Sequence, residues 1–132
     1  MVNSPWCKDK LASLVQEVID QQRVKFPAVE AGVVWSLEGS VLVAQLRNAI
    51  NKDDWYWLIG GENLATDIAP GSVASTPKEL VRYFALRWQI GVEQLRKALN
   101  VKVNALSTHE KSKELQKMAE GLYVLSETDG IW

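Results

Sequence analysis

The segment DDWYWLIGGENLATD, residues 53–67, decides how this chain is expected to fold. Its first half is rich in aromatic and aliphatic side chains, which is typical of a β-strand. Side chains alternate between the two faces of a strand, so Trp55 and Trp57 share one face while Tyr56 and Leu58 share the other. Because both faces are apolar, the sequence predicts a central strand that is covered on both sides.

Two further strands are predicted before this one, over residues 31–37 and 41–50, where β-branched and aromatic residues are frequent. The sequence LEGS at 37–40 indicates a tight turn in which Gly39 supplies a positive φ, and NKDD at 51–54 indicates a second, polar turn. Short turns join antiparallel neighbours, so the three strands form a meander. The alternative for 41–50 is a helix, because alanine, leucine and glutamine favour that state.

A helix is predicted at the N-terminus. Ser4 is a good N-cap and Pro5 a good first helical residue, and apolar side chains then recur at helical spacing. We expect this helix to run from about Pro5 to about Val24 and to end before Pro27, because the residue preceding a proline avoids helical geometry.

Two more helices are predicted after the sheet. Thr76 is the expected N-cap of the first, with Pro77 at its first position and Glu79 completing a capping box. Its expected buried stripe consists of Val81, Phe84, Trp88, Val92, Leu95 and Leu99. A last helix begins near Ser107. The predicted fold class is therefore α+β, with an N-terminal helix, a three-stranded antiparallel meander and two C-terminal helices packed on the sheet, in a single globular domain over residues 1–132.

Composition excludes several classes of function. The 132 residues include 15 basic and 16 acidic side chains, so no concentrated basic surface for nucleic acid is expected. No apolar run approaches the ~18 residues of a membrane span, and no signal-peptide pattern opens the chain. A cytoplasmic protein with no membrane partner is predicted. Cys7 is the one cysteine and His109 the one histidine, so we expect no cofactor, no metal and no catalytic residue among them.

Residues 60–75 are predicted to form a long loop, and long loops are often functional. Gly60 and Gly61 lack the lysine and hydroxyl residues of a phosphate-binding loop, so they indicate a sharp backbone turn. Glu62 and Asp67 could act as general acid and base or bind a hard cation if they share a cleft. The alternative is that Asp67 or Thr66 bonds nearby backbone amides while Glu62 is solvated.

Six tryptophans are many for a chain of this length. The sequence places three of them in the core and leaves three near the ends of elements, where exposure would indicate a protein interface or an aromatic ligand site. The expected core residues are Trp35, Trp57 and Trp88, and the others are Trp6, Trp55 and Trp132. Arg82 and Arg87, which neighbour Tyr83 and Trp88, could line an anionic pocket or simply form a solvated helix face.

The segments WYWLIGGENLATD and TPKELVRYFALRWQ resemble a family of small, uncharacterised bacterial proteins classed as a domain of unknown function. The positions that carry the resemblance are Trp6, Cys7, Trp57, Gly61, Glu62, Thr66, Asp67 and Trp88. The chain departs from the family pattern at residues 62–65, which read Glu-Asn-Leu-Ala where the family prefers an aspartate and a Leu-Pro pair. The resemblance covers about half of the chain and implies that the loop matters, without implying a function.

The leading hypothesis from the sequence is a non-enzymatic protein-interaction module that uses the aromatic surface near Trp55 and the 62–67 loop. Its partner could be another protein or a second copy of the chain, which would give a homodimer. The second hypothesis is a small-molecule-binding protein or small hydrolase with Glu62 and Asp67 in its cleft. The residues predicted to bind a ligand or partner are Trp55, Trp57, Glu62, Thr66, Asp67, Arg82 and Trp88.

Overall fold

The computed structural model describes residues 4–24, 29–51, 53–99 and 106–132, with the side chains of 94–99 and 106–112 outside the description. The chain divides into two compact units, Met1–Pro77 and Lys78–Trp132. The prediction of a single domain stays a prediction.

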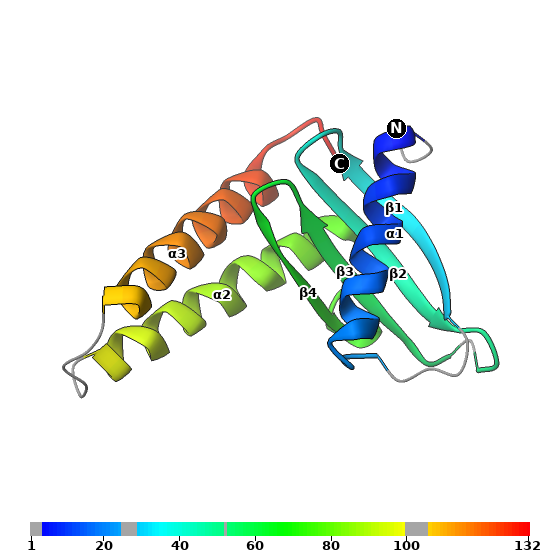
Figure 1. The fold of residues 1–132 in the computed structure, drawn as a ribbon. Coiled ribbons are helices and arrows are strands. Elements are labelled where there is room, and N and C mark those ends of the chain that lie inside the picture. Colours follow the sequence, from blue (N-terminus) through cyan, green and yellow to red (C-terminus); the bar gives the residue numbers. More distant parts are fainter. Residues whose placement is uncertain (1–3, 25–28, 52, 100–105) are drawn as a thin grey trace. The chain divides into compact units, whose positions relative to one another are not determined.

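The first unit holds one helix and an antiparallel sheet (Figure 1). The helix is α1 (Pro5–Asp20), and the strands are β1 (Val29–Leu37), β2 (Val41–Asn48), β3 (Trp55–Gly61) and β4 (Leu64–Pro70). Within the described residues the sheet has four strands in the order β1-β2-β3-β4, and every neighbouring pair is antiparallel. The α+β class and the meander are therefore confirmed, whereas the prediction of three strands is wrong.

The fourth strand comes from the segment predicted to be a loop, residues 60–75. Gly60 and Gly61 lie inside β3, and the chain turns one residue later, at Glu62 and Asn63. Asn63 has a φ of 55°, a left-handed conformation that asparagine tolerates better than most residues. A short 3₁₀ helix, η1, follows β4 at Gly71–Val73. The prediction of a long loop is wrong because a two-residue turn returns the chain to the sheet.

The paired glycines allow close packing, at Gly60 against α1 and at Gly61 against the backbone of Ser40, and the prediction that they form a turn is wrong. A Cβ at position 60 would lie 2.6 Å from both δ-carbons of Leu14 in α1. A Cβ at position 61 would lie 1.9 Å from the carbonyl oxygen of Ser40 on the neighbouring hairpin. Glycine in a strand often marks such a close approach.

The predicted turn before β2 is confirmed, and so is the described part of the predicted turn at 51–54, of which Lys52 lies outside the described residues. Gly39 has a φ of 76°, and the Ser40 amide donates to the carbonyl of Leu37 at 2.9 Å. In the second turn the side-chain oxygen of Asn48 accepts from the amides of Ile50 and Asn51 at 2.9 and 3.3 Å. Residues of β2 pair with both β1 and β3, so the helical alternative for this segment is wrong.

Helix α1 begins where the sequence predicts and ends earlier. The Ser4 hydroxyl accepts from the Cys7 amide at 3.2 Å, which is an N-cap bond. At the other end Gln22 adopts a φ of 56°, and the Arg23 amide donates to the carbonyl of Val18 at 3.0 Å. This Schellman motif ends the helix at Asp20 instead of near residue 24. Pro27 lies outside the described residues.

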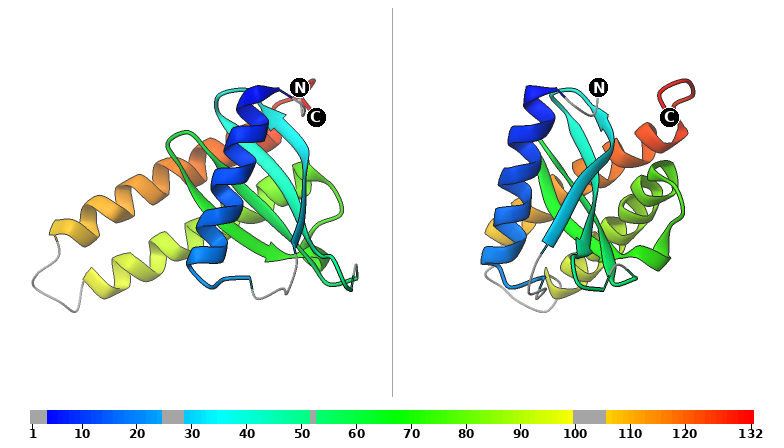
Figure 2. Two further views of the ribbon diagram at one scale, coloured as in Figure 1. Left: turned by 45° about the vertical axis from the view of Figure 1, so that its right-hand side comes forward. Right: turned by 90° about the vertical axis from the view of Figure 1, so that its right-hand side faces the viewer.

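Helix α1 lies along one face of the sheet, as the views in Figures 1 and 2 agree. Its buried side chains join those of one sheet face in a core cluster: Cys7, Leu14, Val18, Val24, Leu42, Ala44, Leu46, Leu58 and Ile68. Residues of the alternate set in β2 and β3, including Val43, Trp57 and Ile59, are buried as well. The prediction that the WYW strand is buried on both faces is therefore confirmed.

The second unit consists of α2 (Pro77–Leu99) and α3 (Leu106–Glu127). The predicted starts of both helices are confirmed to within one residue. Side chains of the predicted α2 stripe that the structure describes are buried: Val81, Phe84, Trp88 and Val92. Among the described residues, no helix has the length and apolar character needed to cross a membrane. The prediction that these two helices pack on the sheet stays a prediction.

Helices α2 and α3 run antiparallel as a helical hairpin. Arg82 near the start of α2 forms a 3.3 Å ion pair with Glu127 at the end of α3. Further along, a Cβ at position 91 would lie 3.3 Å from a methyl group of Leu115, so Gly91 permits close contact between the helices. The indole of Trp132 donates to the carbonyl of Leu125 at 3.2 Å, so the C-terminal tryptophan folds back onto α3.

Candidate functional site

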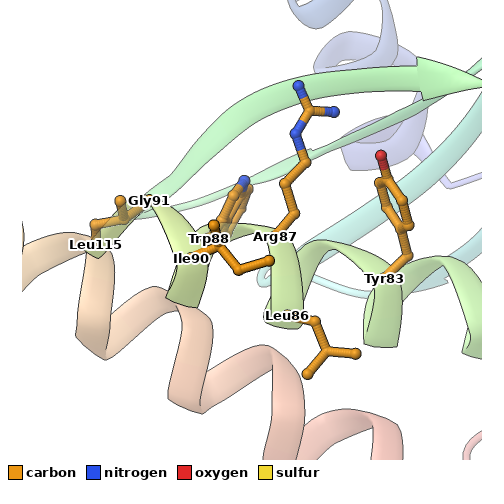
Figure 3. A pocket seen from close by; sticks show the side chains of 7 residues that line it. All are labelled: Tyr83, Leu86, Arg87, Trp88, Ile90, Gly91 and Leu115. Carbon is orange, nitrogen blue, oxygen red and sulfur yellow. The ribbon is translucent and has the colours of Figure 1, made fainter. Parts of the chain in front are cut away.

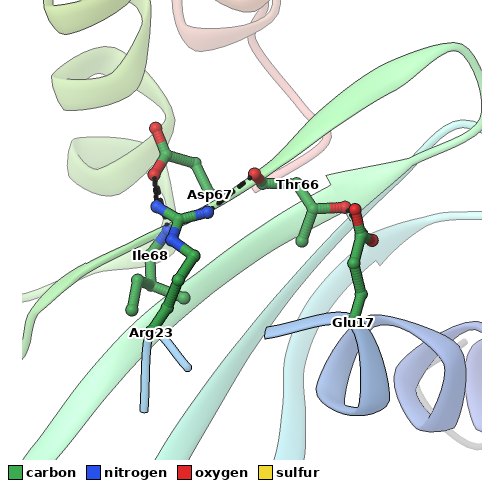
Figure 4. A network of polar contacts seen from close by, with 5 residues as sticks. All are labelled: Glu17, Arg23, Thr66, Asp67 and Ile68. Carbon is green, nitrogen blue, oxygen red and sulfur yellow. Dashed lines mark hydrogen bonds and ion pairs between the residues drawn. The ribbon is translucent and has the colours of Figure 1, made fainter. Parts of the chain in front are cut away.

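Asp67 takes part in a polar network between β4 and the end of α1 (Figure 4). Arg23, positioned by the Schellman turn, forms an ion pair with the Asp67 carboxylate and donates to the carbonyl of Thr66 at 3.2 Å. Asp67 also accepts from the Ile68 amide at 2.8 Å, and the Thr66 hydroxyl donates to Glu17 at 2.7 Å. Only 15% of the Asp67 side chain is exposed. These contacts fasten the second edge strand to the helix.

Glu62 has different partners, near the start of α1. Its carboxylate lies 3.3 Å from the Lys10 ammonium and accepts from the Trp6 indole at 3.4 Å. The side chain is 52% exposed. Glu62 and Asp67 thus pair with basic residues at opposite ends of the same helix. Within the described part of the chain, Thr66 and Asp67 share Arg23 as a partner, whereas Glu62 contacts Lys10 and Trp6.

Trp57 and Trp55 form a contact pair at the start of β3. The Trp57 ring is buried, and its indole donates to two backbone carbonyls, those of Gly71 at 3.2 Å and Ala74 at 3.1 Å. Trp55 is half-buried and lies edge-on to Trp57, with 5.2 Å between the ring centroids. The Arg47 guanidinium lies over the Trp55 ring, 5.6 Å from its centroid. Both rings therefore hold η1 and the adjoining strands in place.

The remaining tryptophans follow the prediction only in part. Trp88 is buried as expected, whereas Trp35, expected in the core, is half-buried. Trp6 and Trp132 are half-buried as well, so neither is fully exposed. Near Trp55 a hollow of about 430 Å³ is lined by Asp53, Asp54, Trp55, Tyr56, Pro70, Gly71 and Ser72.

Two hollows lie on the helical hairpin and share two apolar side chains. The first, of about 530 Å³, is lined by Tyr83, Leu86, Arg87, Trp88, Ile90, Gly91 and Leu115 (Figure 3). The second, of about 460 Å³, is lined by Leu86, Gln89, Ile90, Val92, Glu93 and Gln116. Leu86 and Ile90, common to both, are 49% and 60% exposed. Trp88 is buried as the sequence predicts, whereas Leu86 and Ile90 were not among the residues predicted to bind a partner.

Arg82 lies on α2 outside these hollows. Besides its ion pair with Glu127, its guanidinium lies 6.0 Å from the ring centroid of Tyr123. It therefore braces the two helices against each other. Arg87, by contrast, lines the first hollow together with Tyr83.

Metal and nucleophilic chemistry find little support in the described part of the chain. No group of three or more His, Cys, Asp and Glu side chains is arranged there to hold a metal ion. Cys7 is buried in the α1–sheet core, and its thiol donates to the Ser36 hydroxyl at 3.2 Å.

A protein-family model matches residues 2–132, nearly the whole chain, and its description is a domain of unknown function, DUF4826. The chain belongs to the DUF4826 family. The predicted resemblance to a domain of unknown function, which came from the tryptophan-rich segment, is thereby confirmed. Comparisons with curated proteins and with solved structures give no match. Membership of DUF4826 supplies no activity, so a functional proposal depends on the geometry of the two units.

Proposed function

We propose that this DUF4826 protein is a non-enzymatic protein-interaction module whose contact surface is the outer stripe of α2, defined here as Glu79, Tyr83, Leu86, Ile90 and Glu93. The observation that carries the proposal is the pair Leu86 and Ile90. They lie one turn apart, on the side of α2 opposite its buried stripe, and each remains about half exposed. Exposed apolar residues that adjoin concave surface are typical of protein-binding sites.

The polar surroundings of this pair also suit a protein partner. Glu93, Gln89 and Gln116 border the second hollow, so an apolar centre is framed by groups that can form hydrogen bonds. A central apolar anchor within a polar rim is the usual anatomy of a specific interface. Loop residues 62–67, favoured by the sequence, contribute less, because Glu62, Thr66 and Asp67 all bond to α1 or the residue after its end turn.

The second hypothesis, a ligand-binding protein or hydrolase with paired carboxylates, draws less support. Such chemistry needs two acids directed at one substrate position. Here one acid pairs with Lys10 and the other with Arg23, at opposite ends of α1. The paired carboxylates therefore serve α1 packing in the geometry described.

Site-specific photo-crosslinking in cells tests the proposal. A photoreactive side chain placed at position 86 or 90 is expected to give discrete protein adducts. The matched control is position 50, where Ile50 is 77% exposed in a turn of the first unit and is expected to give none. If positions 86 and 90 give no more adduct than position 50, the outer stripe of α2 is not a protein-binding surface.

A further inference from the structure

The outer stripe of α2 has a sequence pattern that identifies its partner chemically. Its residues recur at alternating spacings of four and three, the spacing of a helix-pairing seam. From one end to the other, the described seam positions are Glu79, Tyr83, Leu86, Ile90 and Glu93, all within α2 (Pro77–Leu99).

We propose that the partner is a second copy of this chain, paired antiparallel through α2 about a two-fold axis midway between Leu86 and Ile90. This rests on the proposed function, since it names the partner of the same surface. A two-fold interface is self-complementary, so each residue must suit the one it meets. In this arrangement Leu86 of one copy meets Ile90 of the other, and the most exposed apolar side chains of α2 cover each other.

The polar positions suit the same symmetry. Each Tyr83 meets Glu93 of the other copy, so a phenol donor faces a carboxylate acceptor. A parallel second copy would instead set Glu79 and Glu93 each against its own equivalent. Like charges face to face disfavour that alternative, so charge selects the antiparallel orientation.

The interface is small, because the described apolar contribution from each copy is centred on two side chains. Interfaces of this size are weak and transient, and we expect a dissociation constant on the order of micromolar or weaker. The association should therefore be strongly dependent on protein concentration.

Sedimentation velocity on the purified full chain is the first test. The wild-type protein is expected to sediment faster as concentration rises toward about 1 mM, a range that captures weak binding. The variants Leu86→Ser and Ile90→Ser are expected to remain monomeric, while Ile50→Ser, an equally polar change at a more exposed site, should behave as wild type. Circular dichroism confirms that each variant is folded.

Cysteine cross-linking tests the orientation. A mixture of Tyr83→Cys and Glu93→Cys chains is expected to form a disulfide-linked pair, and neither variant alone should do so. Two copies of position 83 are separated by ten residues along the antiparallel seam, about 15 Å, which is too far for a disulfide. The buried Cys7 should not compete. Cross-linking by Tyr83→Cys alone, without a gain in the mixture, would overturn the antiparallel arrangement.

The two proposals fail in different ways. A wild-type chain that stays monomeric to about 1 mM overturns the second copy as partner. Adducts of another mass at positions 86 and 90 in cells would then still support an interaction module with a different protein. Absence of adducts there, together with a monomeric chain, overturns both.

Discussion

The contact between Leu14 and Gly60 determines how closely α1 approaches the sheet, and it can be tested by a pair of substitutions. A Cβ at position 60 would lie 2.6 Å from both δ-carbons of Leu14, whereas carbon atoms prefer about 3.5–4.0 Å. Gly60→Ala therefore overpacks the core at a cost of about 1–3 kcal/mol. Alanine also loses less conformational entropy on folding than glycine, which offsets this cost by ~0.4–1 kcal/mol. We expect a net destabilisation of about 1–2 kcal/mol.

The second substitution, Leu14→Ala, removes the two carbons that collide. Alone it should cost about 2–5 kcal/mol, because it leaves a cavity under α1. When Leu14→Ala is already present, the new methyl group of Gly60→Ala fills part of the cavity, so adding Gly60→Ala should be neutral or stabilising. The double variant is therefore expected to be more stable than the sum of the single effects by about 1–3 kcal/mol.

Urea unfolding, followed by both tryptophan fluorescence and circular dichroism, measures these free energies. Gly32→Ala is the matched control, because it places the same methyl group in β1 where no heavy atom lies within 4 Å. It should be neutral or slightly stabilising and additive with Leu14→Ala. If Gly60→Ala and Leu14→Ala also prove additive within about 0.5 kcal/mol, α1 does not pack on the sheet as described.

Three further predictions concern buried polar groups and the thiol. Trp57→Phe leaves two backbone carbonyls without their indole donor and should lower the free energy of unfolding by about 1–3 kcal/mol in urea titrations, with an unchanged secondary structure. Arg23→Gln leaves the mostly buried Asp67 carboxylate without its cation, so it should destabilise more than the double change with Asp67→Asn, as thermal unfolding would show. The thiol of Cys7 should resist a thiol reagent in the native protein and react fully in denaturant, which absorbance of the released thiolate reports.

Local sequence signals predicted most of the first three strands. Gly39 supplies a positive φ in the first turn, and the hydrogen bonds of both turns join residues two or three positions apart, so the turns can be recognised from the adjacent sequence alone. The two-sided burial of Trp57 and Leu58 likewise follows from an apolar run. The capping signals Ser4-Pro5 and Thr76-Pro77 predicted where α1 and α2 begin.

Strand β4 could not be predicted in the same way, because distant residues stabilise it. Its sequence LATDIAP includes Asp67, an unfavourable strand residue by propensity. That carboxylate is accommodated by Arg23, which precedes it by 44 positions and is directed toward it by a Schellman turn. The glycine pair misled the prediction for a related reason, because Leu14 and Ser40 occupy the space that side chains at 60 and 61 would need. Tertiary contacts therefore overrode the local preference.

The outer stripe of α2, in contrast, was accessible from the sequence, because Leu86 and Ile90 follow Tyr83 at helical spacing. The sequence did not single out these two residues, because the stronger apolar stripe of Val81, Phe84, Trp88 and Val92 already explains how α2 is buried. Exposure alone would not single out the outer stripe, since Ile50 and Val124 are 77% and 64% exposed, and isolated exposed aliphatic residues are common.

What distinguishes Leu86 and Ile90 is the combination of adjacency and symmetry. They border the same two hollows, and the residues on either side of them are ordered so that Tyr83 of one copy meets Glu93 of the other when the helix is reversed. A solvated helix face has no reason to keep such an order, whereas a self-paired helix requires it. A Glu93→Ala change should therefore weaken self-association about tenfold, since it removes the carboxylate acceptor that each Tyr83 meets in the other copy. Sedimentation of the Glu93→Ala variant equal to that of the wild-type protein would refute this pairing.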